Sequence, residues 1–127
     1  NGLEQWHHVM KEGDMEALYD LLHPDCVFIS PVVHTPQEGR EITYAYLRAA
    51  NKALSEDFQY VREVVQDNHA VLEFTVKVDG IFVNGVDIIT FEGDQIVELK
   101  VMVRPLKAVN AVWKQMGQML EQLKAAS

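Results

Sequence analysis

The chain has 127 residues, 48% of them hydrophobic and 24% charged, so residues 1–127 are expected to form one domain with its own core. Its net charge of −8 repels nucleic-acid phosphates and anionic lipid surfaces, and its 11 lysines and arginines are scattered along the chain. Neither nucleic acid nor a membrane is therefore an expected partner. The only cysteine, Cys26, cannot form an internal disulfide, and this predicts a cytoplasmic location.

The N-terminal part of the chain is predicted to be helical. Apolar residues recur at helical spacing from Leu3 to Glu12, and Gly13 is suited to end that helix. Asp14 is a suitable N-cap for a second helix, which we expect to continue to Leu22. The sequence therefore predicts two short helices separated by a glycine.

A strand, a loop and a third helix are expected next. The apolar run from Cys26 to Ser30 predicts a short strand, which Pro31 ends because proline has no N–H to donate. Residues 31–39 are predicted to form a loop. A helix is then expected from Arg40 to Leu54, with an apolar stripe along one side.

Two antiparallel strands are predicted in the middle of the chain. They run over Phe58–Gln66 and Ala70–Asp79, with a turn between them at residues 67–68. The dipeptides Asp79-Gly80 and Asn84-Gly85 are typical of turns, so we expect turns there that lead into the following hairpin. The second strand alternates cleanly between apolar and polar residues, as in a sheet with one wet face.

A long hairpin is predicted over residues 85–105, with its turn at Glu92-Gly93-Asp94. Side chains of one parity share a face of a strand. Here the odd positions are almost all apolar, and Asp87 is their one carboxylate. The members of this face are Asp87, Ile89, Phe91, Val97, Leu99, Val101 and Val103.

A final helix is predicted after Pro105, running to about Lys124, with an apolar stripe that includes Trp113. Helices come first, an antiparallel sheet follows, and a long helix ends the chain. This order predicts an α+β fold in which a curved, cone-shaped antiparallel sheet carries the N-terminal helices on its concave face.

The order of elements resembles the nuclear transport factor 2-like superfamily, and its SnoaL-like and ketosteroid isomerase-like branch most of all. The resemblance covers nearly the whole chain. It is carried by Gly13-Asp14-Met15-Glu16, by residues 31–41 with Gly39-Arg40-Glu41, and by Asp87-Ile-Ile-Thr-Phe91 followed by Gly93-Asp94-Gln95-Ile96.

The resemblance assigns roles position by position. Asp87 stands where ketosteroid isomerases keep an oxyanion-hole aspartic acid, held neutral by apolar surroundings. Ser30 stands where those enzymes keep their base aspartate, and Trp6 where they keep a catalytic tyrosine. Serine is no general base and indole transfers no proton, so steroid isomerisation does not follow from the resemblance.

Two other branches of the superfamily use different acid sets. Limonene epoxide hydrolases use two aspartates and an arginine, whereas this chain offers Asp87 with Arg62 as its possible companion. SnoaL-like polyketide cyclases often use one aspartate in an apolar pocket, and the chain departs least from that arrangement.

The candidate catalytic residues are Asp87, Tyr46, Ser30 and His34. Each also has a structural interpretation. Asp87 could be a buried carboxylate satisfied by Tyr or Trp donors, Tyr46 could be a core residue, and His34 could be an ordinary loop histidine. The expected ligand-binding wall consists of Trp6, Phe28, Leu72, Phe74, Ile89, Phe91, Leu99, Val101 and Val103.

No cofactor or metal is expected, since the histidines and Cys26 show no ligand spacing and the glycines show no phosphate-binding pattern. Cys26 itself is expected to be a buried thiol. Val86, Ile88 and Met102 are predicted on the outer sheet face among charges, which favours a homodimer through that face.

Three functions stay open at this point. The first is a cofactor-free acid/base isomerase or cyclase acting on a small hydrophobic molecule, with Asp87 at its centre. The second is a non-catalytic module that binds such a molecule. The third is a dimeric interaction module whose cavity is filled by side chains.

Overall fold

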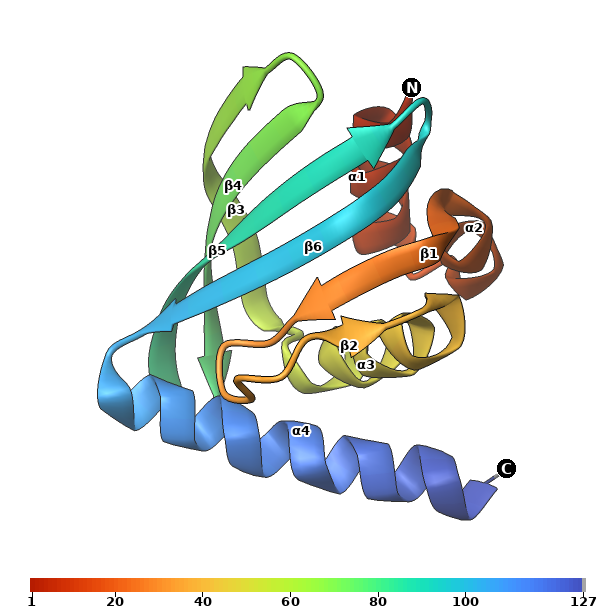
Figure 1. The fold of residues 1–127 in the computed structure, drawn as a ribbon. Coiled ribbons are helices and arrows are strands. Elements are labelled where there is room, and N and C mark those ends of the chain that lie inside the picture. Colours follow the sequence, from red (N-terminus) through yellow and green to blue (C-terminus); the bar gives the residue numbers. More distant parts are fainter. Residues whose placement is uncertain (127) are drawn as a thin grey trace.

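The computed structural model describes the backbone of residues 1–126 and the side chains of residues 1–122. This part of the chain forms four helices and a six-stranded sheet (Figure 1). The helices are α1 (Gly2–Glu12), α2 (Met15–Leu21), α3 (Arg40–Ala53) and α4 (Leu106–Ala126). The strands are β1 (Leu22–Ile29), β2 (Gln37–Glu38), β3 (Glu56–Gln66), β4 (His69–Val78), β5 (Ile81–Glu92) and β6 (Gln95–Arg104).

The sheet has the strand order β2-β1-β6-β5-β4-β3 and confirms the predicted α+β fold class. Strands β3 to β6 form a continuous antiparallel meander, as expected from their turn residues. One pair departs from the prediction, because β1 runs parallel to β6. The sheet is therefore mixed rather than antiparallel throughout.

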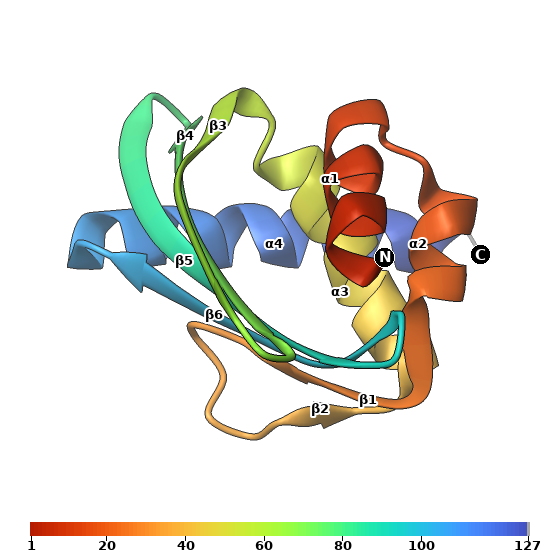
Figure 2. The same ribbon diagram turned by 90° about the horizontal axis from the view of Figure 1, so that it is seen from above.

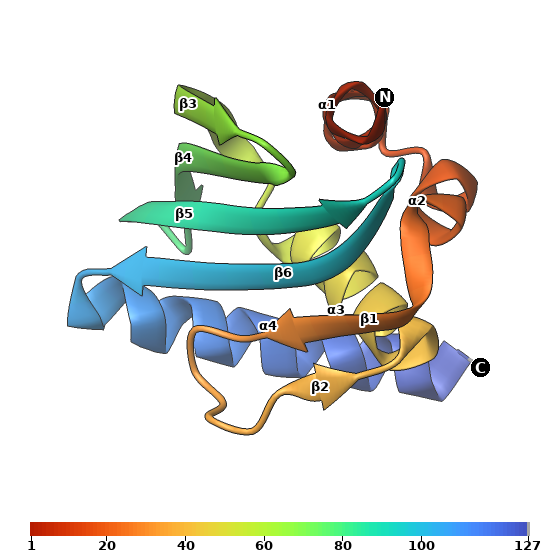
Figure 3. The same cartoon turned by 45° about the horizontal axis from the view of Figure 1, so that its top comes forward.

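The sheet curls around the helices, so that one of its faces is concave. Figure 2 shows α1 and α3 inside the curve, and Figures 1 and 3 show α4 running along the opposite end of the hollow from α1. Alternate residues of β4 and β5 point inwards and are buried, beginning with Ala70, Leu72 and Phe74 on β4. Burial of this face against the helices supplies the main stabilising free energy of the domain.

The predicted C-terminal end of α1 and the predicted start of α2 are confirmed by their caps. Gly13 ends α1 with a left-handed φ of 69°, a conformation that glycine adopts at little cost. The Asp14 carboxylate accepts a hydrogen bond of 3.1 Å from the backbone N–H of Ala17 and so caps α2.

The boundary between α2 and β1 was predicted wrongly. The helix ends one residue earlier than expected, and β1 already begins at Leu22, which pairs with Ile96 of β6. The ladder then shifts register before Val27, so Pro24 falls where no ladder hydrogen bond is lost. The predicted loop after β1 also contains the two-residue strand β2, paired with Val27 and Phe28.

The predicted turn at Asn84-Gly85 is wrong, because both residues lie inside β5. Gly85 has a different reason to be glycine. A Cβ built on it would come within 2.3 Å of Cζ of Phe74 on the neighbouring strand. The glycine therefore makes room for the Phe74 ring.

The inward parity of β6 is interrupted close to the turn. Phe91 pairs with Ile96 and Thr90 with Glu98, so an extra residue is accommodated at Val97. Ile96 is consequently buried and Val97 is only partly buried, which corrects the predicted inward position of Val97.

Helix α4 confirms the predicted apolar stripe at Val112 and in part at Met116, but not at Trp113, and it also buries two alanines. Ala108, Ala111 and Val112 face the core, whereas Trp113 is 63% exposed. None of the helices that the structure describes combines the length and apolar character needed to span a membrane.

Candidate functional site

Asp87 is the central polar residue of the concave face. It lies in the middle of β5, paired with Leu72 on β4 and Val101 on β6, and only 7% of it is exposed. The alternation of β5 turns it inwards together with Ile89, as the sequence pattern indicates. A carboxyl group in such surroundings needs a hydrogen-bond partner.

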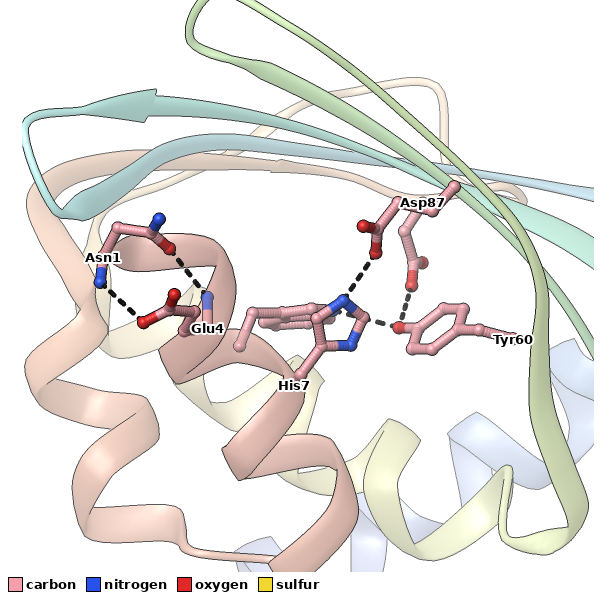
Figure 4. Close-up of polar contacts among 7 residues, drawn as sticks. Asn1, Glu4, His7, Tyr60 and Asp87 are labelled. Carbon is pink, nitrogen blue, oxygen red and sulfur yellow. Dashed lines mark hydrogen bonds and ion pairs between the residues drawn. The ribbon is translucent and has the colours of Figure 1, made fainter.

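A chain of hydrogen bonds connects Asp87 to α1 (Figure 4). The Tyr60 hydroxyl on β3 donates to Oδ2 of Asp87 over 2.7 Å. The indole N–H of Trp6 in turn donates to the Tyr60 oxygen over 3.0 Å. One oxygen of the carboxyl is thus fixed, and among the described residues nothing donates to Oδ1.

Burial governs the protonation of this group. Removal from water raises the pKa of Asp87 to about 7, and the hydrogen bond from Tyr60 opposes the rise by stabilising the carboxylate. Burial, followed by the neighbouring negative charge of Asp87, raises the pKa of Tyr60 far above its ordinary value. Tyr60 is therefore a permanent donor, and Asp87 is the group that titrates near neutral pH.

Asp87 lines a cavity of about 160 Å³ between the sheet and the helices. Its walls are mainly apolar side chains from the sheet, all four helices and the loop after β1. Six of the predicted wall residues line it, namely Trp6, Phe28, Phe74, Leu99, Val101 and Val103.

Ser30 and Tyr46 also line the cavity, and neither hydroxyl donates a hydrogen bond to a described residue. The Ser30 oxygen accepts from the backbone N–H groups of Val32 at 3.1 Å and Val33 at 3.4 Å, which leaves its own hydrogen free to donate. The Tyr46 ring lies against Phe28, with 5.3 Å between the ring centroids. No described residue accepts from its hydroxyl.

Four of the predicted site residues lie away from the cavity. His34 is exposed in the loop after β1 and does not line it. Leu72, Ile89 and Phe91 are buried in the core cluster that also contains Trp6 and Phe28, and they do not line the cavity. They support the wall without forming it.

Sequence reasoning missed Tyr60 and misplaced Arg62. Arg62 lies 3.4 Å from the Glu73 carboxylate, with 74% of its side chain exposed, so it is no companion of Asp87. The residue that contacts the Asp87 carboxyl is Tyr60. The signal that could have identified it is the aromatic alternation of Phe58 and Tyr60 at the start of β3, where the two rings pack edge to face at 5.1 Å.

Metal-ligating side chains do not gather at the cavity. Within the part of the chain that is described, no three His, Cys, Asp or Glu residues converge on a point. Cys26 is fully buried as predicted, and burial raises the pKa of its thiol. The chemistry that these residues can perform is therefore proton transfer and hydrogen bonding around Asp87.

The family model of the SnoaL-like domain matches residues 3–99. The chain belongs to the SnoaL-like domain family. A crystal structure of a steroid delta-isomerase from Pseudomonas aeruginosa has a TM-score of 0.92 and 35% sequence identity to it, with 98% of this chain and 92% of that chain covered. A comparison with curated protein sequences gave no match.

Two further structures place the SnoaL-like chain in its wider fold. An uncharacterised cystatin-like protein from Silicibacter pomeroyi has a TM-score of 0.85 and 30% identity, over 92% of this chain and 83% of that one. A proposed SnoaL-like polyketide cyclase from Jannaschia sp. CCS1 has a TM-score of 0.70 and 16% identity, over 87% and 90% of the two chains. At that identity the likeness shows the fold alone, which is the nuclear transport factor 2-like fold predicted from the sequence.

Proposed function

We propose that this SnoaL-like protein binds a small hydrophobic molecule carrying a carbonyl group and rearranges it as a cofactor-free isomerase or cyclase. One observation carries the proposal: a carboxyl with a pKa of about 7 lies in a mainly apolar cavity with one oxygen unoccupied. A group that titrates near the working pH can both take up and release a proton. The similarity to a steroid delta-isomerase supports a ring ketone as substrate.

The proposed reaction moves one proton within the substrate. The Asp87 carboxylate takes a proton from the carbon beside the carbonyl, and the electron pair of that C–H bond moves towards the carbonyl oxygen. The carboxylic acid then returns the proton to another carbon of the enolate. Atoms and electrons are conserved, so no cofactor is required. In a cyclisation, the acid form of Asp87 would hydrogen-bond to the carbonyl that is attacked.

Ser30 and Tyr46 suit the role of stabilising the enolate oxygen. Both line the cavity, and both have a hydroxyl hydrogen available. A donor aimed at a developing negative charge in a dry cavity contributes much more than the same donor in water. Since Ser30 stands where ketosteroid isomerases keep a base, the single carboxyl of Asp87 would perform both proton transfers.

Isomerisation of a β,γ-unsaturated ring ketone tests this proposal. We would use 3-cyclohexen-1-one and a Δ5-3-ketosteroid, and follow the ultraviolet absorbance of the conjugated product. The expected rate rises with pH through about 7 as Asp87 ionises. Asp87→Asn should lower the rate by about 10²–10⁴-fold, because the amide cannot take up the proton.

Asp94→Asn is the matched control for that experiment. It makes the same chemical change at an exposed position in the turn of the same hairpin, so the wild-type rate is expected. A rate for Asp87→Asn equal to that of the wild type would contradict the proposed role of Asp87.

A second candidate function is binding without catalysis. It is favoured by the absence of a second carboxyl or a histidine from the described cavity lining, which leaves no separate base. Calorimetric binding of either ketone to the wild type, without turnover at any pH, would select this alternative. The third possibility, a filled cavity, fits poorly with an opening of about 160 Å³ beside Asp87.

We also propose that the protein is a cytoplasmic homodimer formed through the convex face of the sheet. A groove on that face is lined by Val71, Val86 and the half-exposed Met102, and it carries charges of both signs from Arg62, Glu73 and Arg104. Such a mixed surface can complement a second copy of itself across a two-fold axis. Met102→Glu should convert a dimer into a monomer in light scattering, and a monomeric wild type at micromolar concentration would contradict the proposal.

A further inference from the structure

The hydrogen-bond chain from Trp6 through Tyr60 to Asp87 has a fixed direction (Figure 4). An indole N–H can only donate, so the Tyr60 oxygen accepts from Trp6 over 3.0 Å. The Tyr60 hydroxyl has one hydrogen, and Oδ2 of Asp87, 2.7 Å away, is its acceptor. A hydroxyl hydrogen turned towards Trp6 instead would meet a second donor. Tyr60 therefore donates to Asp87 whether or not Asp87 is ionised.

This direction decides which oxygen of Asp87 can carry a proton. A protonated carboxyl has its hydrogen on one of its two oxygens. On Oδ2 that hydrogen would face the hydrogen of Tyr60, and one of the two would lose its acceptor in a buried place. Such a loss is costly, because neither group can turn to water. A hydrogen on Oδ1 leaves the bond from Tyr60 intact.

Oδ1 is also the oxygen that is open to the cavity. No described residue donates to it. Within the described part of the chain, the one fully buried side-chain oxygen or nitrogen without a partner is Oγ1 of Thr43. Oδ1 is not sealed off in this way, and Asp87 lines the cavity, so Oδ1 borders open space. A proton on Oδ1 thus faces the place proposed for the substrate.

Asp87 has few other polar neighbours. Its partners on the adjacent strands are apolar, and the described cavity lining contains no other Asp, Glu, His, Lys or Arg. Burial, followed by the neighbouring carboxylate, raises the pKa of Tyr60, the hydrogen bond from Trp6 opposes the rise, and the exposed Glu63 adds to it. Without the bond from Trp6, Tyr60 would be a weaker donor to the carboxylate.

We infer that Trp6 is a positioning residue, whose N–H fixes the direction of the Tyr60 hydroxyl and thereby holds the proton of Asp87 on Oδ1. The catalytic consequence rests on the proposed function: one and the same oxygen takes the proton from the substrate and returns it. Trp6 performs this role through Tyr60 and does not have to contact the substrate.

Infrared spectroscopy tests the placement of the proton without any substrate. The difference between spectra at about pH 5 and about pH 9, taken for the wild type and for Asp87→Asn, isolates the C=O stretch of protonated Asp87. A C=O group that accepts a hydrogen bond absorbs at a lower frequency than a free one. With the proton on Oδ1, the carbonyl oxygen is Oδ2, so the wild type should show the lower frequency and Tyr60→Phe the higher one. A wild-type band at the frequency of a free carbonyl would overturn the inference.

An indole analogue tests the role of the Trp6 N–H. In benzothienylalanine a sulfur atom replaces the N–H and the ring keeps its size, so the packing of buried Trp6 is retained. Incorporation into Trp113→Phe exchanges Trp6 alone, because the chain has two tryptophans. The Asp87 band should move to higher frequency, and its pH midpoint should rise by about 0.5. Trp113→Phe with an ordinary Trp6 is the matched control and should give the wild-type spectrum.

Turnover of 3-cyclohexen-1-one supplies a kinetic readout. The analogue protein should lose about threefold to tenfold in kcat, with KM changed by less than about twofold, because part of the Asp87 acid then holds its proton on the oxygen that faces Tyr60. A change in packing alone would leave the infrared band and its pH midpoint where they are.

The outcomes separate this inference from the proposed function. An analogue protein with the wild-type band, midpoint and kcat would show that Trp6 serves packing alone, while loss of turnover in Asp87→Asn would still support the function. The expected band shifts without turnover of any ketone would support the placement of the proton and reject the isomerase.

Discussion

Two neighbouring residues of α1 make polar contacts with the same strand in different surroundings. Trp6, 2% exposed, donates to Tyr60 on β3, and through it the contact continues to Asp87. The next residue, His7, contacts Glu63 on the same strand over 2.6 Å, with 41% and 45% of the two side chains exposed. Figure 4 shows the two links beside each other.

The comparison shows that burial, rather than the length of the contact, decides what a polar link does. The shorter contact, between His7 and Glu63, is the exposed one. Water can solvate each of these side chains when the contact is broken, so the contact contributes little to the free energy of unfolding. In the buried link, Asp87 cannot be solvated if it ionises, and its pKa rises to about 7. The buried link is therefore the part of the molecule that is expected to respond to pH and to substitution.

The largest expected effect is on the pH dependence of stability. Asp87 has a pKa of about 7 in the folded protein against 3.8 for an unperturbed aspartate, so the folded state binds its proton more tightly than the unfolded state. The contribution of Asp87 to the free energy of unfolding is therefore fully present below pH 4, and it is lost as the pH rises from about 4 through 7. The difference of about three pKa units corresponds to about 4 kcal/mol.

Urea denaturation of the wild type and of Asp87→Asn between pH 4 and 9 measures this effect. The free energy of unfolding of the variant, relative to the wild type, should rise by about 4 kcal/mol over that range. Asp94→Asn, which changes an exposed turn residue, should follow the wild type. A constant difference between Asp87→Asn and the wild type would show that Asp87 is solvated in the folded state.

A smaller effect is expected when the middle of the buried link is removed. Tyr60→Phe takes away the donor to Asp87 and the acceptor for Trp6, which should cost about 1–3 kcal/mol. Because the hydrogen bond from Tyr60 stabilises the carboxylate, the variant should also have a higher Asp87 pKa. The loss should thus be greater at pH 8 than at pH 5. Equal losses at the two pH values would mean that Tyr60 does not contact the ionised group.

The sequence was sufficient to place Asp87 but not its partner. Strand β5 alternates strictly between buried and less buried positions, so parity alone assigns Asp87 to the concave face. Strand β3 is almost entirely exposed, and its register against β4 shifts on both sides of residues 59–60. Each shift reverses the parity, and the contact with Trp6 spans 54 residues, so the parity of the strand does not assign Tyr60 to the site.

The order of the elements was predictable because it depends on local sequence patterns. The errors arose where contacts across the sheet determine the structure. Apolar periods and caps identify the helices and the meander, because each depends on neighbouring residues. The role of Gly85 depends on Phe74, which lies across the sheet, and the parallel pairing of β1 depends on β6. Trp113 illustrates the same limit, since its helical spacing predicted burial and the helix instead packs through its alanines.

The smallest effect is expected at the exposed link, and it is the strictest test of the comparison. A double-mutant cycle with His7→Gln and Glu63→Gln should give a coupling energy of about 0.2–1 kcal/mol, as is usual for an exposed pair. The coupling should weaken in 1 M salt, since about 3 Å of screening length remains there. A coupling above 2 kcal/mol, or one that salt does not change, would place His7 and Glu63 in the buried class with Tyr60 and Asp87. The contrast between the two links would then have to come from their hydrogen-bond geometry and not from water.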